Sequence, residues 1–194
     1  HTQCAGGHGQ MIITISGMPG SGKSTVAKVI AKKLNIKRYY IGGMRREIAR
    51  KHGITLEQLN EIGEKEDWTD KEVDNYQREL GKKEDNFIIE GRTSFFLIPN
   101  SVKVFLDVDF ETGVKRIFDE ISKDATERNE GDFRTLEDAK KAIKKRMDSD
   151  NIRYKKYYNV DVFDRSQYDI VLDTTNLTKE QVVEKLLEEI MKRE

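Results

Sequence analysis

A segment near the start of the chain has the residue types and spacing of a phosphate-binding loop: it reads GMPGSGKST. Gly17, Gly22, Lys23 and Ser24 fit the pattern GxxxxGK[ST], between an apolar run and a helical pattern. Glycines let backbone amides surround phosphate groups at the positive end of a helix. Lys23 is therefore expected to reach the β- and γ-phosphates of a nucleotide, and the Ser24 hydroxyl to ligate Mg²⁺.

Arginines that follow predicted strands provide further cations. Arg46 follows the second apolar run, and Arg92 ends FIIEGR after the third, two residues beyond Glu90. In a doubly wound sheet the carboxyl ends of the strands face the ligand crevice, so these side chains should converge near the phosphate-binding loop. The planar guanidinium group suits phosphate oxygens, which it binds bidentately.

Three charged residues of a late predicted helix share one face. Arg146, Asp150 and Arg153 are spaced four and then three residues apart, which brings their side chains together. Such a pattern is typical of a solvated ladder of opposite charges, and it is also what an anion site would need. Spacing alone leaves both interpretations open.

The bulk composition makes any anion site local. The chain has 194 residues, which suits one domain, and its 35 basic and 35 acidic residues give a formal net charge of zero. That balance provides no general attraction to nucleic acid or to an anionic membrane. No apolar run approaches the roughly 20 residues that span a bilayer, and no signal-peptide pattern is present. We expect a soluble, cytoplasmic monomer that binds neither nucleic acid nor membrane.

Residues 1–10, HTQCAGGHGQ, are interpreted as an expression remnant or a disordered tail. Without them the chain has no cysteine, and His52 is its only histidine. Disulfide scaffolds, Cys/His zinc sites, thiol nucleophiles and Ser/His/Asp triads are thereby excluded. The chemistry must come from Arg, Lys, Asp, Glu and hydroxyl groups.

The elements that must position these residues alternate along the chain. Nearly continuous apolar runs are typical of strands buried on both faces of a parallel sheet, and strands that alternate with helices predict an α/β fold. Thr178 is expected to cap the last helix. The predicted strands are 11–16, 37–41, 86–91, 102–108 and 168–174, and the predicted helices are 23–34, 44–51, 55–65, 70–81, 111–123, 135–157 and 178–192.

Two regions interrupt this alternation. Residues 44–85 contain several helical patterns and no strand, which is more than a plain crossover needs and predicts a small helical insertion. Residues 122–135 are polar and contain glycine, between two helical patterns, and predict a mobile loop.

A phosphate-binding loop indicates a nucleotide but not a reaction. GTPase switches need a guanine-reading NKxD element, which the sequence lacks. Motor and remodelling ATPases carry a hydrophobic run that ends in adjacent acids, for which VFLDVD is a poor substitute. Small kinases remain, in which catalysis is mostly positioning and charge neutralisation.

The chain resembles the nucleoside monophosphate kinase family of P-loop proteins, and within it the cytidylate kinases of the short archaeal type. Over residues 11–194 the matching features follow in family order: the P-loop, EGR, VKVFLDV, the R-x-x-x-D-x-x-R pattern and VLDTTNLTKEQVVEKLL. The resemblance implies a three-layer α/β/α fold with a five-stranded parallel sheet. It divides the chain into a core of 11–43, 86–121 and 136–194, a monophosphate-binding insertion at 44–85 and a lid at 122–135.

The resemblance also implies roles for single residues. Arg92, Arg146 and Arg153 would hold the CMP phosphate together with Arg46, and Asp150 would contact the ribose and orient the arginines. Glu90 would organise Mg²⁺ through water, with Ser24. Lys23, Arg92, Arg146 and Arg153 are the predicted catalytic residues. The predicted ATP-binding residues are Gly17, Met18, Pro19, Gly20, Ser21, Gly22, Lys23, Ser24, Thr25, Arg116, Arg128, Thr174 and Asn176.

Base recognition departs from the family pattern. Tyr40 stands where a serine is expected, and Thr93 replaces the acid that follows the arginine of EGR in bacterial cytidylate kinases. We therefore predict that cytosine is read by other groups of the insertion, Asp70, Asp74 and Gln77, which have suitable donors and acceptors. The predicted reaction is ATP- and Mg²⁺-dependent phosphorylation of CMP or dCMP. The alternatives are UMP, AMP or another small acceptor, and a non-enzymatic ATP-binding switch or adaptor.

Overall fold

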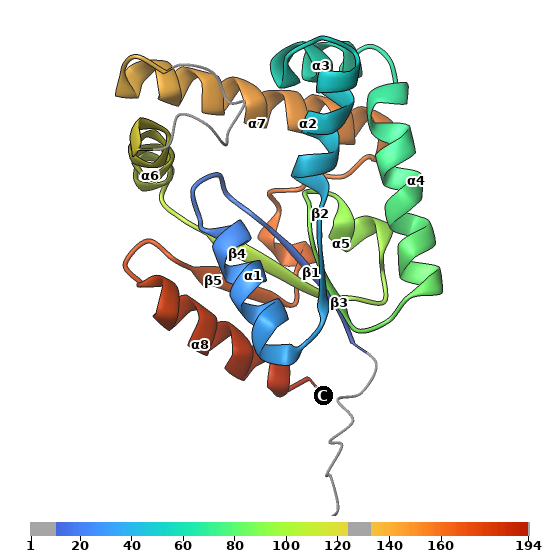
Figure 1. Ribbon diagram of the computed structural model, residues 1–194, viewed down its shortest axis with the longest axis vertical. Coiled ribbons are helices and arrows are strands. Elements are labelled where there is room, and N and C mark those ends of the chain that lie inside the picture. The colour runs from blue at the N-terminus through green and yellow to red at the C-terminus, as the bar shows by residue number, and fades with distance from the viewer. Residues whose placement is uncertain (1–10, 124–132, 194) are drawn as a thin grey trace, which may run out of the picture.

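The computed structural model describes residues 11–123 and 133–193. Its centre is a five-stranded sheet in the order β2-β3-β1-β4-β5, and every neighbouring pair is parallel (Figure 1). Because all strands run the same way, their carboxyl ends share one edge of the sheet. The strands are β1 (Ile12–Gly17), β2 (Lys37–Tyr40), β3 (Phe87–Glu90), β4 (Val102–Asp107) and β5 (Ile170–Asp173).

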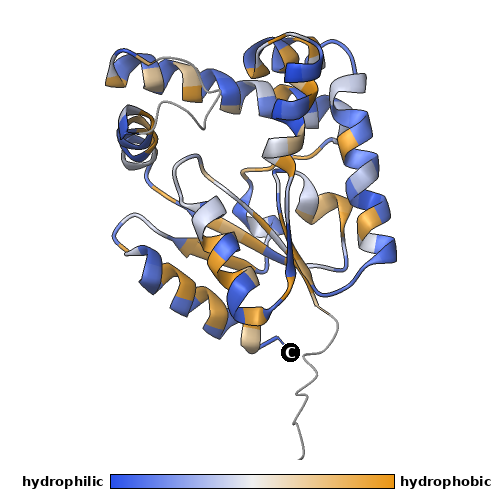
Figure 2. Ribbon diagram, viewed as in Figure 1, coloured by the Kyte–Doolittle hydropathy of each residue, from blue (hydrophilic) through white to orange (hydrophobic). Residues whose placement is uncertain are grey.

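The apolar runs are continuous because both faces of the sheet are covered, as predicted. Along β1, Ile13 and Ile15 enter one core cluster and Ile12 enters another. The same alternation occurs in β4, where Val104 and Phe105 pack on opposite faces. In Figure 2 the sheet and the inner sides of its flanking helices form the apolar centre. This confirms the three-layer α/β arrangement.

Different helices cover the two faces of the sheet. One face packs against α1 (Lys23–Leu34) and α8 (Lys179–Met191). The other packs against α4 (Trp68–Lys83), the short α5 (Ser94–Leu97) and the carboxyl end of α7 (Leu136–Tyr158). The sequence did not predict α5 or the 3₁₀ turn η1 (Arg165–Gln167), because each is too short for a helical period to be visible.

Local chemistry sets several helix ends. Thr178 begins α8 with a capping box, in which its side chain accepts from the Gln181 amide and Gln181 bonds back to its backbone. The predicted cap is thus confirmed. Thr55 begins α3 (Leu56–Gly63) with the same arrangement, and Asn35 ends α1 in the left-handed conformation that suits asparagine.

The segment between β2 and β3 contains α2 (Ile41–Lys51), α3 and α4 and no strand. α2 and α3 rise above the carboxyl edge of the sheet, where α3 packs against α7, and α4 returns along one face of the sheet (Figure 1). The predicted helix at 44–51 begins earlier, at Ile41, directly after the strand. Whether this segment behaves as a separate monophosphate-binding insertion stays a prediction.

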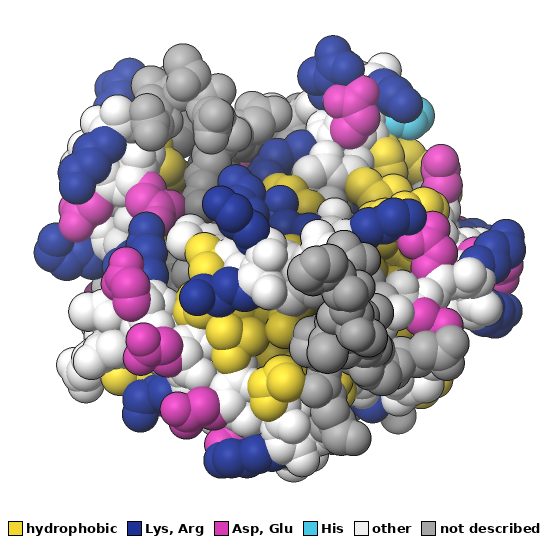
Figure 3. All heavy atoms as spheres, turned by 60° about the horizontal axis from the view of Figure 1, so that its bottom comes forward, with side chains coloured by type: hydrophobic (Ala, Val, Ile, Leu, Met, Phe, Trp, Pro, Cys, Tyr) yellow, Lys and Arg dark blue, Asp and Glu magenta, His cyan; other side chains and the backbone are white. Residues whose placement is uncertain are grey.

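The predicted lid lies mostly outside the described residues, and Arg128 lies with it. On either side of it are α6 (Phe110–Lys123) and α7, which pack against each other. Within the described ranges, no helix is both long enough and apolar enough to cross a membrane. Basic and acidic side chains are interspersed on the face in Figure 3, in keeping with the zero net charge.

Candidate active site

Glycines, which have no side chain, allow the close packing of the phosphate-binding loop. A Cβ on Gly20 would lie 2.2 Å from the backbone oxygen of Gly113, and one on Gly17 would lie 2.1 Å from that of Leu106. Gly20 and Gly22 also have φ of 77° and 86°, a region that glycine adopts without penalty. The loop therefore packs tightly against β4 and α6 and turns into the amino end of α1.

Two polar side chains of the loop, those of Lys23 and Ser21, are placed to bond a nucleotide. The Lys23 ammonium donates to the carbonyl oxygens of Gly17 and Met18, at 3.3 and 2.9 Å. The Ser21 hydroxyl is buried and has no hydrogen-bond partner among the described residues. A buried hydroxyl without a partner is costly unless a ligand satisfies it, so the loop fits a polyphosphate.

Ser24 and Glu90 form the place that a divalent cation would take. The Ser24 hydroxyl donates to one Glu90 oxygen at 2.6 Å, and the Arg38 guanidinium donates to the other at 3.0 Å. No group of three or more His, Cys, Asp or Glu side chains that could by itself hold a metal ion is found in the described part of the chain. One hydroxyl and one carboxylate beside a phosphate loop suit Mg²⁺, which keeps several waters and takes its other ligands from substrate phosphates.

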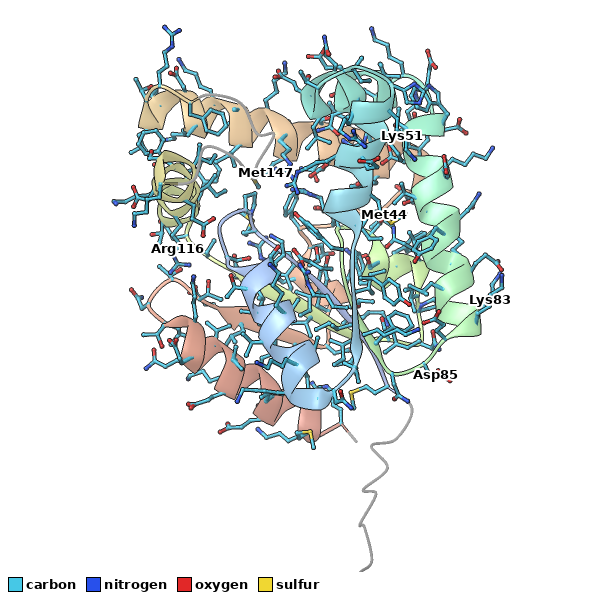
Figure 4. All side chains as sticks on the ribbon, viewed as in Figure 1. Met44, Lys51, Lys83, Asp85, Arg116 and Met147 are labelled. Carbon is cyan, nitrogen blue, oxygen red and sulfur yellow. The ribbon has the colours of Figure 1, made fainter. Side chains whose placement is uncertain are left out.

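Arg116 ties the loop to the start of the last α/β connection. From α6 it donates to the Gly20 carbonyl at 3.3 Å and to the carbonyls of Thr174 and Thr175, each at 3.0 Å. Figure 4 shows Arg116 on the side of α6 that faces this connection. The predicted ATP-site residues Arg116 and Thr174 are thus in contact. Asn176, two residues on, is exposed.

One cavity joins the phosphate-binding loop to α2, α4 and α7 at the carboxyl edge of the sheet. It brings together residues from segments far apart in the chain, as the topology predicts for a doubly wound sheet. The predicted site residues that line it are Pro19, Gly20, Gly22, Lys23, Ser24, Thr25, Arg46, Asp70, Asp74, Glu90, Arg92, Arg146, Asp150 and Arg153.

Five buried or half-buried charges, which we name the arginine network, form one wall of the cavity. Asp70 accepts from Arg45 at 2.5 Å and from Arg153 at 3.0 Å, and Asp150 accepts from Arg153 and Arg92. The network joins α2, α4, α7 and the end of β3. Burial lowers the pKa of Arg92, but guanidinium groups keep their proton in proteins, so its charge remains.

Arg153 and Arg92 differ in the donors that they have left. Arg153 is 1% exposed and donates four hydrogen bonds, to Asp70, Ser149, Asp150 and Tyr154. Arg92 donates one, to Asp150, within the described residues. Arg153 is therefore mainly an anchor for the two carboxylates, whereas Arg92 has N–H groups to offer a ligand.

Asp74 is the unusual acid of the cavity. It is 3% exposed and forms no ion pair with a described residue. Its bonds come from the Tyr158 hydroxyl and, at 3.5 and 3.4 Å, from Thr93 and Gln77. Burial raises its pKa from 3.8 to about 6, although the Tyr158 bond opposes the rise. A buried acid without a cation partner indicates a function.

Comparison with known proteins identifies the family of the chain. A family model described as "Cytidylate kinase-like family" matches residues 12–176. The chain belongs to the cytidylate kinase-like family. A cytidylate kinase of Archaeoglobus fulgidus is 33% identical over 93% of this chain and 94% of the relative. One of Methanocaldococcus jannaschii is 35% identical over 89% and 93%.

Solved structures add the fold alone. A shikimate kinase of Bacteroides thetaiotaomicron aligns with a TM-score of 0.63 and 17% identity, over 94% of this chain and 99% of that one. The family and the α/β fold expected from the sequence are confirmed, and the enzyme class is nucleoside monophosphate kinase.

The three predicted base-reading residues have different surroundings in this cytidylate kinase-like enzyme. Both oxygens of Asp70 are bonded to arginines of the network. Gln77 is fully buried, bonds Ser94 and Asp74, and does not line the cavity, so the prediction that it contacts the base is corrected: it supports Asp74 from behind. Asp74 lines the cavity, and one of its oxygens accepts only two long hydrogen bonds, from Gln77 and Thr93. Of the three residues, it is therefore the one best able to accept a hydrogen bond from a base.

Sequence reasoning missed three residues of this cytidylate kinase-like site. Arg45 lies buried between Asp70 and Asn60, and nothing in its sequence position distinguishes it from the neighbouring Arg46. Arg38 bonds Glu90 from β2, and Tyr40 contacts two arginines. A signal was available for Arg38: a charged residue in a strand of a buried parallel sheet needs a partner.

Proposed function

We propose that the protein transfers the γ-phosphoryl group of ATP to CMP or dCMP in the presence of Mg²⁺. The observation that supports this most is Asp74, a buried carboxylate without a cation partner in the cavity that begins at the phosphate-binding loop. Such a group suits a ligand that brings its own N–H donors. The cytidine base brings an exocyclic amine, whereas uracil presents a carbonyl oxygen at that position.

On the donor side, backbone amides of the loop would surround the ATP phosphates, and Lys23 would exchange its carbonyl partners for phosphate oxygens. Ser24 would exchange its bond to Glu90 for a metal ligand position, and Glu90 would hold metal-bound water. When bound, Mg²⁺ would reduce the negative charge of the phosphates. Arg116 bonds both the loop and Thr174, and would thereby position Thr174 near the adenine.

On the acceptor side, Arg46, Arg92 and Arg146 line the same cavity and are candidates to hold the CMP phosphate in line with ATP. Arg153 would keep Asp70 and Asp150 in place, and Asp150 would meet the ribose. No covalent intermediate is needed, because two phosphorylated substrates are brought together and their charge is neutralised by fixed cations.

The base would be placed by Asp74 with help from the side chains behind it. Gln77 and Tyr158 each donate to its carboxylate, which fixes its orientation. In its charged form the carboxylate can only accept hydrogen bonds, so it favours the cytosine amine over the uracil carbonyl. Adenine also has an exocyclic amine, so the charge rejects UMP more strongly than AMP.

ADP formation measured against CMP, dCMP, UMP and AMP tests this proposal. We expect CMP or dCMP to give the highest kcat/KM, and Asp74→Asn to lower the ratio of kcat/KM for CMP over UMP at least about tenfold, because an amide can also donate to the uracil oxygen. Glu72→Gln, which removes an exposed charge from the same helix, is the matched control. Preference for UMP or AMP would refute the assignment, and no response to any monophosphate would favour an ATP-dependent switch.

A further inference from the structure

Tyr40, at the end of β2, contacts two arginines, Arg38 of β2 and Arg46 of α2. The Arg46 guanidinium donates to its hydroxyl at 2.7 Å, and the carbon of that guanidinium lies 5.6 Å from the ring centre. The Arg38 guanidinium carbon lies 5.2 Å from the same ring centre. Both distances are within the range of cation–π attraction.

The two arginines serve different partners. Arg38 donates to Glu90, which also accepts from Ser24, so it holds the acid on the magnesium side. Arg46 lines the cavity from α2 and is a candidate for the acceptor phosphate. In the sheet, Tyr40 pairs with Glu90 in the register of β2 and β3. Arg38 lies two residues before Tyr40 on the same strand, so both side chains are on the same face of the sheet.

The surrounding backbone leaves room for this ring. A Cβ on Gly42 would lie 2.9 Å from the Tyr40 ring, and one on Gly43 would lie 3.1 Å from it. Glycine is a poor helix former, so two successive glycines in the first turn of α2 call for a packing reason. The reason here is that the ring lies against the amino end of α2, where a side chain would displace it.

We propose that Tyr40 is a positioning residue of the acceptor site: it holds Arg46 toward the acceptor phosphate, and its ring steadies Arg38 on Glu90. The inference rests on the proposed function, because it assumes that Arg46 binds the phosphate of a nucleoside monophosphate. It adds a consequence that base recognition by Asp74 does not share. Tyr40 acts on the phosphate, so its effect must be the same whichever base the acceptor carries.

The test is Tyr40→Phe, which keeps the ring and removes only the hydroxyl. We expect the KM for CMP to rise about tenfold, as for a lost hydrogen bond to a charged group, with kcat and the KM for ATP unchanged. The same rise should occur with UMP and AMP. Tyr39→Phe is the matched control, because the Tyr39 hydroxyl bonds Glu84 away from the cavity, and it should leave every constant unchanged.

A second variant distinguishes the role of Arg38 from that of Arg46. Arg38→Met keeps the apolar stem and removes the bond to Glu90, so the Mg²⁺ concentration for half-maximal rate should shift severalfold while the KM for CMP does not. Calorimetric titration with CMP, without ATP, gives a readout that does not need turnover: Tyr40→Phe should weaken binding by the same factor as it raises the KM.

An unchanged KM and an unchanged CMP affinity in Tyr40→Phe would overturn the inference, as would an effect that depends on the base. Failure of the proposed function looks different. Wild-type protein would then form no ADP with any monophosphate and bind none, whereas failure of this inference leaves the wild-type reaction intact. Circular dichroism and the unfolding midpoint of Tyr40→Phe should match wild type.

Discussion

The phosphate-binding loop and the arginine network face each other across one cavity but are built in opposite ways. The loop offers backbone amides, and it is shaped by glycines at which any side chain would collide with Leu106 or Gly113. The network offers guanidinium groups from three elements, and it is held by carboxylates buried between them. The loop is therefore sensitive to added atoms and the network to removed charges.

The largest expected effect is Asp70→Ala, which breaks the network. It leaves Arg45 and Arg153 buried without the carboxylate that both bond, and removing one partner of a buried pair destabilises a protein by about 3 to 5 kcal/mol. Chemical denaturation measures the loss. Asp67→Ala, at an exposed position three residues earlier, is the control. Equal stability of the two variants would show that the network is not structural.

Gly20→Ala should distort the phosphate-binding loop, because it adds a methyl group where there is no space. Its new methyl group would lie 2.2 Å from the Gly113 carbonyl oxygen, and backbone cannot move aside as a flexible side chain can. We expect a loss of about 2 to 4 kcal/mol in the free energy of unfolding and no measurable ATP binding. Gly53→Ala has a similar φ of +66° but open space around the added atom, so it reports the conformational strain alone. If the free energy of unfolding falls equally in both variants, the contact with Gly113 does not contribute to the loss of stability.

Asp74→Asn tests a charge that lies beside the network and is not paired by it. The folded-state pKa of about 6 is above the ordinary 3.8, so the folded protein binds a proton more tightly. Stability therefore falls as pH rises from about 4 to 6 and stays reduced above that. At pH 8 the variant should gain about 2 to 3 kcal/mol in the free energy of unfolding while losing preference for CMP.

The same variant should lose the pH dependence that Asp74 causes. Thermal unfolding of both proteins between pH 4 and 8 checks this, with Glu72→Gln as the control. A wild-type unfolding midpoint that rises through this window relative to the variant would mean that Asp74 has a charged partner in solution. If Asp74→Asn is more stable than wild type but prefers CMP less, the Asp74 carboxylate serves substrate recognition at a cost in stability.

The smallest effect is expected from Lys145→Met. Lys145 joins α7 to α3 through Glu57 and Glu61, at 2.5 and 2.9 Å, but all three side chains are more than half exposed. Exposed pairs are screened by water and salt, so the unfolding midpoint should not differ measurably from wild type at 0.15 M salt. A clear loss of stability would show that the distinction between buried and exposed ion pairs does not hold in this protein.

The sequence predicted the phosphate-binding loop better than the arginine network, because the loop is local in sequence and the network is not. The loop is a local motif, so Lys23, Ser24 and their neighbours could be assigned from nine consecutive residues, and the order of strands and helices followed from periodicity. The network depends on contacts between residues as far apart as Asp70 and Arg153. Spacing on one helix placed Asp150 beside Arg153 but could not show that Arg92 would share that carboxylate.

Side-chain direction accounts for the remaining misses. Arg45 and Arg46 are consecutive, yet a helix turns successive side chains about 100° apart, so one enters the network and the other contacts Tyr40. Gln77 lies one turn after Asp74 and was grouped with it, but it points to Ser94. Choosing between such neighbours requires knowing which element lies opposite.

The contact of Arg116 with both the loop and Thr174 has a consequence for synthesis of the chain. β1 emerges from the ribosome first, but its neighbours among the described strands, β3 and β4, come later in the chain. The loop that follows β1 is tied to a connection made some 150 residues later. Nascent chains that end before Thr174 should therefore bind nucleotide poorly. Retention on immobilised ATP would then distinguish finished molecules from truncated ones during translation.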